Sequence, residues 1–480
     1  SVPEAISRSL GNAVPSWASS GTERNNSADI RTGRKALTFM VDSGYQSRYT
    51  VYFTPLESGL NKMHRCAFRQ TTAKSLQMAV WNALGTLLLL LAVVACSSVQ
   101  TETSASEESS RPYVILVSID GFRHDFSSLT DTPAIDRMAR AGLKAEALQP
   151  VFPTLTFPNH FSIASGRLPQ HHGIVANKFP DDNNDRWYSM YDRATVEDGS
   201  WYMAEPAWVT AEKQGVRTAA YYFVGTESDA FGVRPSDWRP FEFGVPGEER
   251  VDQVLEWLGR PEPQRPHLVT LYFEDVDSKT HWYGIGSPEG LQSIRDADRW
   301  LGRLQDGIAS LPFSGQVYIL LVSDHGMAVL NRENALVLDS IISLEDMRIV
   351  EGGPYLFIHF PRADPERALA MRDRINRHWS CGEALGPADL PDSWRAGHSP
   401  RYPDLLLLAA PGCAVVSSRE RLKKLQRADH GWAPDLPDMR CILYATGPRI
   451  PAGSRTGEVH VTDIHPLIME LLDLQAPGPI

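Results

Sequence analysis

From residue 112 to the C-terminus, short apolar runs alternate with amphipathic segments, and this alternation limits the folds open to the chain. The almost wholly apolar run YVILVSI (113–119) is typical of a strand buried on both faces. A helix is predicted soon after it, with Thr132 at the N-cap, Pro133 at the first helical position and Gly142 as the stop signal. The expected fold class is therefore α/β, with a mostly parallel central sheet and helices on both faces.

Similar patterns predict the other elements of this domain. Further strands are expected at 219–224, 267–273, 316–322, 354–360 and 404–410, and further helices at 248–259, 291–311, 365–378 and 462–473. Because no internal repeat or long linker follows Pro112, we expect one α/β domain over 112–480. An excursion of undetermined structure is expected between about 361 and 440.

The first 111 residues lack this patterning and are predicted to lie outside the domain. Residues 1–62 are expected to be disordered or upstream of the translation start, for which Met63 or Met78 is a better candidate. Residues 63–96 combine basic residues, a short apolar run and a small-residue end, as a secretion signal does. A buried core helix is the alternative for the apolar run. Residues 97–111 are predicted to be a polar tether.

The end of the predicted signal resembles the lipobox of bacterial lipoproteins, in which the cysteine is lipidated and becomes the mature N-terminus. This resemblance implies a lipid anchor at Cys96, and Ser97 beside it implies delivery to the outer membrane. We therefore expect an exported protein, either periplasmic or anchored to the outer membrane of a Gram-negative bacterium.

Three cysteines follow the leader. They lack the C-x-x-C spacing of thiolate zinc sites, so a cysteine-based zinc site is not expected. A disulfide between Cys381 and Cys413 is compatible with an oxidising compartment, and Cys441 lies in an apolar run expected to form a buried strand.

Charge argues against one class of partner. The chain has 58 acidic and 47 basic residues, a net charge of −11, and no basic cluster interleaved with aromatic residues. A duplex nucleic acid is therefore not expected as a partner. Small phosphate esters remain compatible, because bound metal can offset the negative charge locally.

Three of the predicted strands, at 113–119, 267–273 and 316–322, are followed by an aspartate. These aspartates are Asp120, Asp277 and Asp324. The carboxyl ends of parallel strands share one edge of the sheet, where ligands bind in open α/β folds. A single aspartate at a strand end is more often a turn or capping residue. Three of them, two accompanied by histidine, favour a metal site.

The histidines complete a predicted set of metal ligands. His281 follows Asp277 by four residues, on the same side of a helical turn, and His325 directly follows Asp324, with Gly326 expected to free the backbone. Carboxylates and imidazoles without thiolate suit zinc, and two sites of three ligands need a sixth group. That group is expected to be His430 in DHGW, ahead of two other late histidines, His398 and His460.

Thr156 is the predicted nucleophile. It precedes the turn FPNH and could open a helix, so that its backbone N–H and its hydroxyl face one point. The alternative is an ordinary helix N-cap.

These motifs, taken in order, resemble those of the nucleotide pyrophosphatase/phosphodiesterases in the alkaline phosphatase superfamily: SIDGF, PTLTFPNH, HGIVAN, DVDSKTH, SDHGM and DHGW. The resemblance covers Tyr113 to the C-terminus. It implies two Zn²⁺ ions, one bound by Asp277, His281 and His430 and the other by Asp120, Asp324 and His325, with Thr156 bridging toward the second. It also implies that Asn177 and the Thr156 N–H stabilise charge on the phosphoryl group.

The resemblance extends to the substrate pocket. It implies that Phe157 and Tyr272 sandwich a nucleobase, with Tyr188, Met190 and Tyr191 lining the same pocket, although each could equally pack in the core. The neutral Asn177 stands where monoester phosphatases place an arginine or a third metal, which favours diesters. Lys279-Thr280 and Gly284-Ile285-Gly286 depart from the family pattern and leave the leaving group open.

The sequence therefore predicts hydrolysis of nucleoside phosphodiester and pyrophosphate bonds to nucleoside 5′-monophosphates, through a phosphothreonine at Thr156. The alternatives are a lysophospholipid-type or phosphonate hydrolase on the same metal site, or a surface lipoprotein that binds without catalysis.

Overall fold

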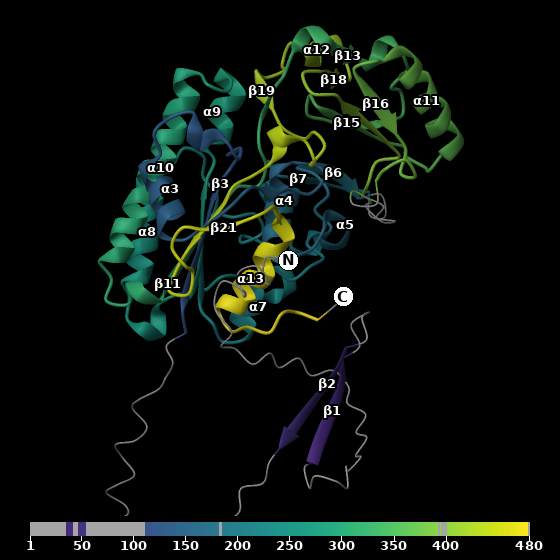
Figure 1. Cartoon of the computed structure of the whole chain (residues 1–480). Helices are drawn as coiled ribbons and strands as arrows, with labels where there is room; N and C mark the ends of the chain where they lie inside the picture. The colour runs from purple at the N-terminus through teal and green to yellow at the C-terminus, as the bar shows by residue number, and fades with distance from the viewer. Residues whose placement is uncertain are drawn as a thin grey trace, which may run out of the picture. The chain divides into compact units, whose positions relative to one another are not determined.

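A computed structural model describes residues 35–41, 47–53, 111–181, 185–391, 394 and 401–478 (Figure 1). The chain divides into two units, each considered by itself. In the N-terminal unit, β1 (Lys35–Val41) and β2 (Ser47–Phe53) pair antiparallel within the segment predicted to be disordered or untranslated. The predicted signal peptide at 63–96, with Cys96, and the tether up to residue 110 lie outside the described residues.

The main unit is built on an eight-stranded sheet in the order β21-β4-β20-β11-β3-β10-β8-β9. Its strands are β3 (Tyr113–Ile119), β4 (Leu143–Ala145), β8 (Thr218–Tyr221), β9 (Asp237–Arg239), β10 (Leu268–Phe273), β11 (Val317–Val322), β20 (Leu443–Thr446) and β21 (Ser454–Thr456). β20 runs antiparallel to both neighbours, and the other pairs are parallel. The predicted mostly parallel sheet is confirmed.

Helices cover both faces of this sheet, and β3 shows why. Its side chains alternate between two apolar cores: Val114 and Leu116 point into one, and Ile115, Val117 and Ile119 into the other. The first core contains residues of α4 (Thr156–Ser165), α7 (Ala207–Lys213) and α13 (Ile464–Leu471), and the second those of α3 (Pro133–Ala141), α8 (Gly247–Leu258) and α10 (Pro288–Ala309), on the opposite side of the sheet in Figure 1. Each buried aliphatic side chain contributes about 1.5–3 kcal/mol, so a continuous apolar run favours a central position.

Helix α3 begins where the sequence predicted, but its first turn is satisfied differently. The Thr132 side chain makes no capping hydrogen bond. The carboxylate of Asp298, on α10, accepts instead from the backbone N–H groups of Ala134 and Ile135, at 3.1 and 2.8 Å. Gly142 is the C-cap, and glycine is required there because a Cβ would lie 2.1 Å from the carbonyl oxygen of Ala445.

A second, antiparallel sheet has the order β14-β15-β17-β16. It consists of β14 (Arg348–Glu351), β15 (Tyr355–His359), β16 (Gly382–Leu385) and β17 (Leu405–Ala409), and α11 (Pro365–His378) packs on one face. The runs at 354–360 and 404–410 are strands, as predicted, but they pair here and not with the central sheet. The excursion therefore starts earlier than residue 361. The sequence did not show this, because an apolar run does not reveal which sheet its strand joins.

The cysteines lie as expected. Cys381 and Cys413 form a disulfide between the start of β16 and the turn after β17, and Cys441 is a free, buried thiol.

The remaining helical segments and strands are short, apart from α9. They include α5 (Pro169–His172), α6 (Arg193–Glu197), α9 (Asp275–Tyr283), α12 (Arg419–Leu422), β5 (Leu148–Gln149), β6 (Lys178–Asp181), β7 (Arg186–Ser189), β12 (Ala328–Val329), β13 (Ala335–Val337), β18 (Ala414–Val416), β19 (Ala428–Asp429) and β22 (Val459–His460). Among the described residues, no helix combines the length and apolarity needed to cross a bilayer.

Asp298→Ala should destabilise the domain by about 1–3 kcal/mol, because two buried N–H groups at the start of α3 lose their acceptor. Chemical denaturation measures this difference in unfolding free energy. Asp306→Ala, on the same helix, is the matched control, since its 72% exposed carboxylate makes only a surface ion pair with Arg137. An equal loss in both variants would contradict the capping role of Asp298.

Candidate metal centre

The acidic groups lie at the carboxyl ends of three adjacent strands. β3 lies between β11 and β10 in the sheet. Asp120 directly follows β3, Asp324 follows β11 by two residues, and Asp277 lies in the first turn of α9, which follows β10. The strand ends therefore bring the three aspartates to one edge, as the sequence predicted.

Two glycines allow this crowding. Gly121 has a φ of +65°, and a Cβ there would lie 2.9 Å from the Cβ and from Oδ1 of Asp277. Gly326 is not in the left-handed region, contrary to the expected need for backbone freedom. It is needed for space, since a Cβ there would lie 2.0 Å from the carbonyl oxygen of Asp438.

Asp120, Asp324 and His325 form one compact group of potential ligands. Nε2 of His325 lies 3.3 Å from Oδ1 of Asp120 and 3.1 Å from Oδ2 of Asp324. All three side chains are buried. This is one of the two predicted ligand sets.

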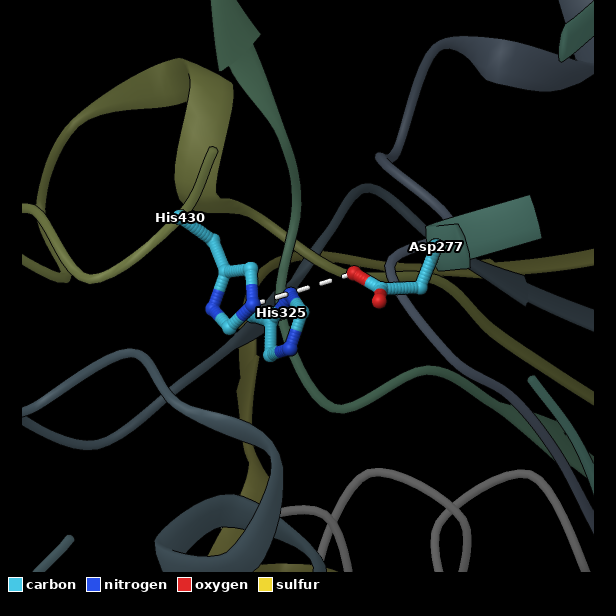
Figure 2. Close-up of side chains that lie close together, drawn as sticks. All are labelled: Asp277, His325 and His430. Atoms are coloured by element: carbon cyan, nitrogen blue, oxygen red, sulfur yellow. Dashed lines mark ion pairs between the residues drawn. The ribbon is translucent and has the colours of Figure 1, made fainter. Parts of the chain in front are cut away.

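The second predicted set adjoins the first. Oδ1 of Asp277 lies 3.2 Å from Nε2 of His281 and 3.7 Å from Nε2 of His430. Figure 2 shows Asp277 facing the imidazoles of His325 and His430, whose rings stack with centroids 3.5 Å apart. Because Asp277, His325 and His430 are themselves within ligating distance of one another, the two sets form one continuous centre.

Each histidine presents the same nitrogen to this centre. Nδ1 of His281, His325 and His430 lies 2.8, 2.9 and 2.8 Å from the backbone carbonyl oxygens of Ala428, Gly326 and Thr154. A proton on Nδ1 that is donated to a carbonyl leaves Nε2 with a free lone pair. This is the arrangement by which proteins orient imidazoles toward metals.

The carboxylates also favour a cation at this centre. Oδ1 of Asp120, Oδ1 of Asp277 and Oδ2 of Asp324 are buried without a well-formed hydrogen bond, and imidazole nitrogens lie 3.1–3.3 Å from them. Buried charge that is left unpaired is strongly unfavourable. Three carboxylates with three imidazoles suit a divalent transition metal, so the residues fit the metal centre predicted from the sequence.

The charges in this centre shift the pKa values of its side chains in opposite directions. Burial and the neighbouring Asp324 and Asp277 raise the pKa of Asp120 well above its usual range. Burial alone would also raise the pKa of Asp324, but His325 and His160 hold it well below that range. Burial disfavours the charged form of His281, yet Asp277 outweighs this and raises its pKa to about 9. Metal binding should therefore release protons.

Asp429 belongs to this centre and was not predicted. It groups with His281 and His430, and its Oδ1 accepts a hydrogen bond from the His430 N–H at 2.9 Å. Burial raises its pKa to about 7. The tripeptide Asp-His-Gly occurs both at Asp324 and at Asp429, and this repetition was the available sequence signal.

Thr156 is the first residue of α4, with its hydroxyl oxygen 3.3 Å from Nε2 of His325. The N-cap is Leu155, so Thr156 is not the N-cap considered as the alternative. The side chain of Asn159 holds the preceding loop, since its Oδ1 accepts from the Val151 N–H and its Nδ2 donates to the carbonyls of Pro153 and Leu155. The loop thus delivers Thr156 to the metal centre at a helix N-terminus, where backbone N–H groups can bind anions.

The comparisons with known proteins agree with this geometry. A family model described as type I phosphodiesterase / nucleotide pyrophosphatase matches residues 114–433. The chain belongs to this family.

Two curated relatives show how much of the family's length the chain shares. Ectonucleotide pyrophosphatase/phosphodiesterase family member 1 of Mus musculus is 30% identical over 80% of this chain but only 43% of its own length. The chain thus spans less than half of that relative. Bis(5'-adenosyl)-triphosphatase enpp4 of Mus musculus is 30% identical over 78% of this chain and 80% of its own length.

Solved structures of the family share the fold. Murine ectonucleotide pyrophosphatase / phosphodiesterase 5 matches with a TM-score of 0.72 at 25% identity, covering 77% of this chain and 97% of that one. The human form matches with the same TM-score and identity, covering 96% of that chain. The family fold is alkaline phosphatase-like, in agreement with the α/β architecture observed.

Asn177 lies beside the start of α4, where Thr156 is, as the family resemblance implied. Its side-chain oxygen accepts a hydrogen bond from the Phe157 N–H at 2.9 Å, in the first turn of α4. With that oxygen engaged, the amide N–H groups are what this side chain can offer to a ligand.

The predicted pocket residues divide into two groups. Phe157 is half-buried beside Thr156, Met190 is half-buried with its N–H donating to the Asn177 carbonyl, and Tyr191 is 85% exposed. Tyr188 is fully buried, with its ring stacked on Phe179 and its hydroxyl 3.0 Å from that of Tyr202. Tyr188 therefore packs behind Phe157, and its predicted place in the pocket lining is wrong.

Tyr272 has a contact that the sequence did not indicate. Its hydroxyl donates a hydrogen bond to Oδ2 of Asp120. The half-buried ring lies edge-on to His160. Its predicted contact with a nucleobase stays a prediction.

Gly121→Ala should weaken metal binding on the order of 10- to 100-fold, because the new methyl group would displace Asp277. Competition with a chromophoric chelator measures the affinity. Gly215→Ala is the control: its φ of +76° is equally unfavourable for alanine, but no atom lies near its Cβ. It should lose about 1–2 kcal/mol of stability without losing metal. Equal metal affinity in the two variants would contradict the close approach at Gly121.

Proposed function

We propose that this protein is a two-zinc hydrolase that cleaves phosphodiester and pyrophosphate bonds of nucleotides to nucleoside 5′-monophosphates. The observation that carries the proposal is the position of Thr156. It is the first residue of α4, and its hydroxyl oxygen lies 3.3 Å from Nε2 of His325 in the metal centre. An isolated threonine is a poor nucleophile, and this setting is one that can activate it.

One zinc ion would be held by Asp277, His281 and His430 and the other by Asp120, Asp324 and His325. The convergence of carboxylate oxygens and Nε2 atoms, with each Nδ1 against a backbone carbonyl, supports this assignment. Bound zinc lowers the pKa of a nearby hydroxyl and stabilises negative charge on oxygen.

The chain's own residues would carry the reaction in two steps. Oγ1 of Thr156 loses its proton to solvent and bonds to phosphorus, while the bond from phosphorus to the leaving oxygen breaks and that oxygen departs with the electron pair, taking up a proton from solvent where its pKa requires one. Water then attacks the phosphothreonine, which restores the Thr156 hydroxyl and releases the nucleoside 5′-monophosphate. The N-terminal N–H groups of α4 and the amide of Asn177 would stabilise the charge on the phosphoryl oxygens in both steps.

The nucleotide part of the proposal has separate support. The mouse relative Bis(5'-adenosyl)-triphosphatase enpp4 is named for an activity on a dinucleotide. In this chain, the half-buried ring of Phe157 beside the nucleophile and the ring of Tyr272 beside Asp120 are surfaces against which a base could stack.

Export and lipid anchoring at Cys96 remain part of the proposal. Their support is the sequence of residues 63–96 alone, and they concern the location of the enzyme and not its chemistry.

Thr156→Ala should abolish turnover of p-nitrophenyl thymidine 5′-monophosphate, because it removes the attacking oxygen, while zinc content stays near that of the wild type. Thr156→Ser keeps a hydroxyl and should retain measurable activity. Full activity of Thr156→Ala would refute the nucleophile. Metal analysis and steady-state kinetics give both readouts.

The wild-type protein decides the substrate class in the same assay. Faster turnover of p-nitrophenyl phosphate would overturn the diester preference. Turnover of a lysophospholipid or phosphonate diester in place of the nucleotide would favour the alternative hydrolases. Zinc binding without turnover of any of these would favour a binding protein.

Asn177→Asp and Asn177→Ala should separate two roles of this side chain. Both remove the amide donor and should lower kcat on the order of 100-fold or more. Asn177→Asp retains the acceptor for the Phe157 N–H, so only Asn177→Ala should also lower the thermal stability. An unchanged kcat in Asn177→Asp would refute the charge-stabilising role.

A further inference from the structure

His160 is a fully buried histidine that the proposed chemistry leaves without a role. It lies on α4 four residues after Thr156, so the two side chains share one side of the helix. Its surroundings connect three segments that are far apart in the sequence.

Both ring nitrogens of His160 contact the metal centre or its supports. Nδ1 lies 2.9 Å from the carbonyl oxygen of Thr156 and 3.2 Å from Oδ2 of Asp324. Nε2 lies 2.8 Å from Oγ of Ser118, on β3 two residues before Asp120. One imidazole therefore contacts the nucleophile's own backbone, a potential metal ligand and the strand that leads to another ligand.

Aromatic rings fix the orientation of this imidazole. Tyr272 and Phe223 lie edge-on to it, with centroids 5.2 and 5.0 Å away. Phe223 has a φ of +143°, which is unusual for a residue with a side chain, and Tyr222 before it also has a positive φ. Backbone strain of this kind persists where the surrounding structure requires it.

We propose that His160 is a positioning residue, which fixes the separation between the Thr156 hydroxyl and the carboxylate of Asp324. The proposal rests on the function proposed above for these two residues. The other oxygen of Asp324 accepts from the Gly121 N–H at 3.1 Å, so the carboxylate is held on two sides. Because a displacement of about 1 Å at a reacting group can lower a rate about 100-fold, a rigid link of this kind has kinetic consequences.

Two substitutions separate the contacts of the ring. In His160→Asn, the amide stands at the position of Nδ1 and can keep the contacts with Thr156 and Asp324. In His160→Gln, the amide stands near the position of Nε2 and can keep only the contact with Ser118. We expect His160→Asn to retain kcat within roughly tenfold, and His160→Gln to lose on the order of 100-fold in kcat with little change in KM.

A second readout is independent of catalysis. Chelator competition on the metal-depleted full chain should show that His160→Gln weakens one of the two zinc sites roughly 10- to 100-fold, and that His160→Asn does not. If the wild type turns over no diester, the proposed function fails, but the order of these zinc affinities still tests the role of His160.

His172→Asn is the matched control. His172 is another fully buried histidine, with Nε2 3.0 Å from Oγ of Ser162 and Nδ1 accepting from the Ile174 N–H. Its substitution should lower stability but leave kcat and both zinc affinities unchanged.

Equal kcat and zinc affinity in His160→Asn and His160→Gln, or the reverse order, would overturn the proposal. If neither variant folds, Ser118→Ala is the deciding variant. It removes the hydrogen-bond partner of Nε2, so the imidazole can rotate, but His160 itself is retained. It should lower kcat severalfold, and unchanged kcat and zinc affinity would overturn the proposal.

Discussion

Mutual repulsion among three carboxylates at adjacent strand ends, two of them buried and the third half-buried, is the constraint on which the rest of this structure depends. Asp120, Asp277 and Asp324 each have one buried oxygen without a well-formed hydrogen bond, next to an imidazole nitrogen. In a buried site such charges must be neutralised by imidazoles, protons or metal ions. The three histidines with inward Nε2 atoms, the close approach at Gly121 and the hydrogen bond from Tyr272 all serve to hold these charges together.

The central sheet supplies the rigidity that this concentration of charge requires. β3 and its two neighbours are parallel and apolar on both faces, so the strand ends carrying two of the aspartates, and the start of α9 carrying the third, are fixed by burial on either side. His430, another potential ligand, follows β19, which pairs with β12 outside the central sheet. The second sheet and its disulfide lie in the excursion between these segments. The potential metal ligands on β3, β11 and α9 thus come from the edge of the central sheet, and His430 comes from the segment after β19, at the end of the excursion.

Sequence reasoning succeeded where local pattern and chemistry coincide. Strand ends, the spacing of Asp277 and His281, and the opening of α4 by Thr156 all depend on contacts within a few residues. It failed where the neighbour is remote. Tyr188 was predicted in the pocket but packs against Phe179 and Tyr202, because an aromatic residue near a site has the same local pattern in a core as in a pocket wall.

The sequence by itself determined the fold class, the family, the six metal-ligand candidates and the candidate nucleophile Thr156, since each has a motif whose residue types are fixed by its chemistry. Only the tertiary structure decided that Asp429 lies among the potential ligands, that Asp298 supports the start of α3, and that His160 contacts both Thr156 and Asp324. These contacts depend on how α3, α4, α10 and the strand ends pack in space. Hydrogen bonds and charge interactions act over a few ångströms, whatever the separation along the chain, and no local pattern encodes that distance.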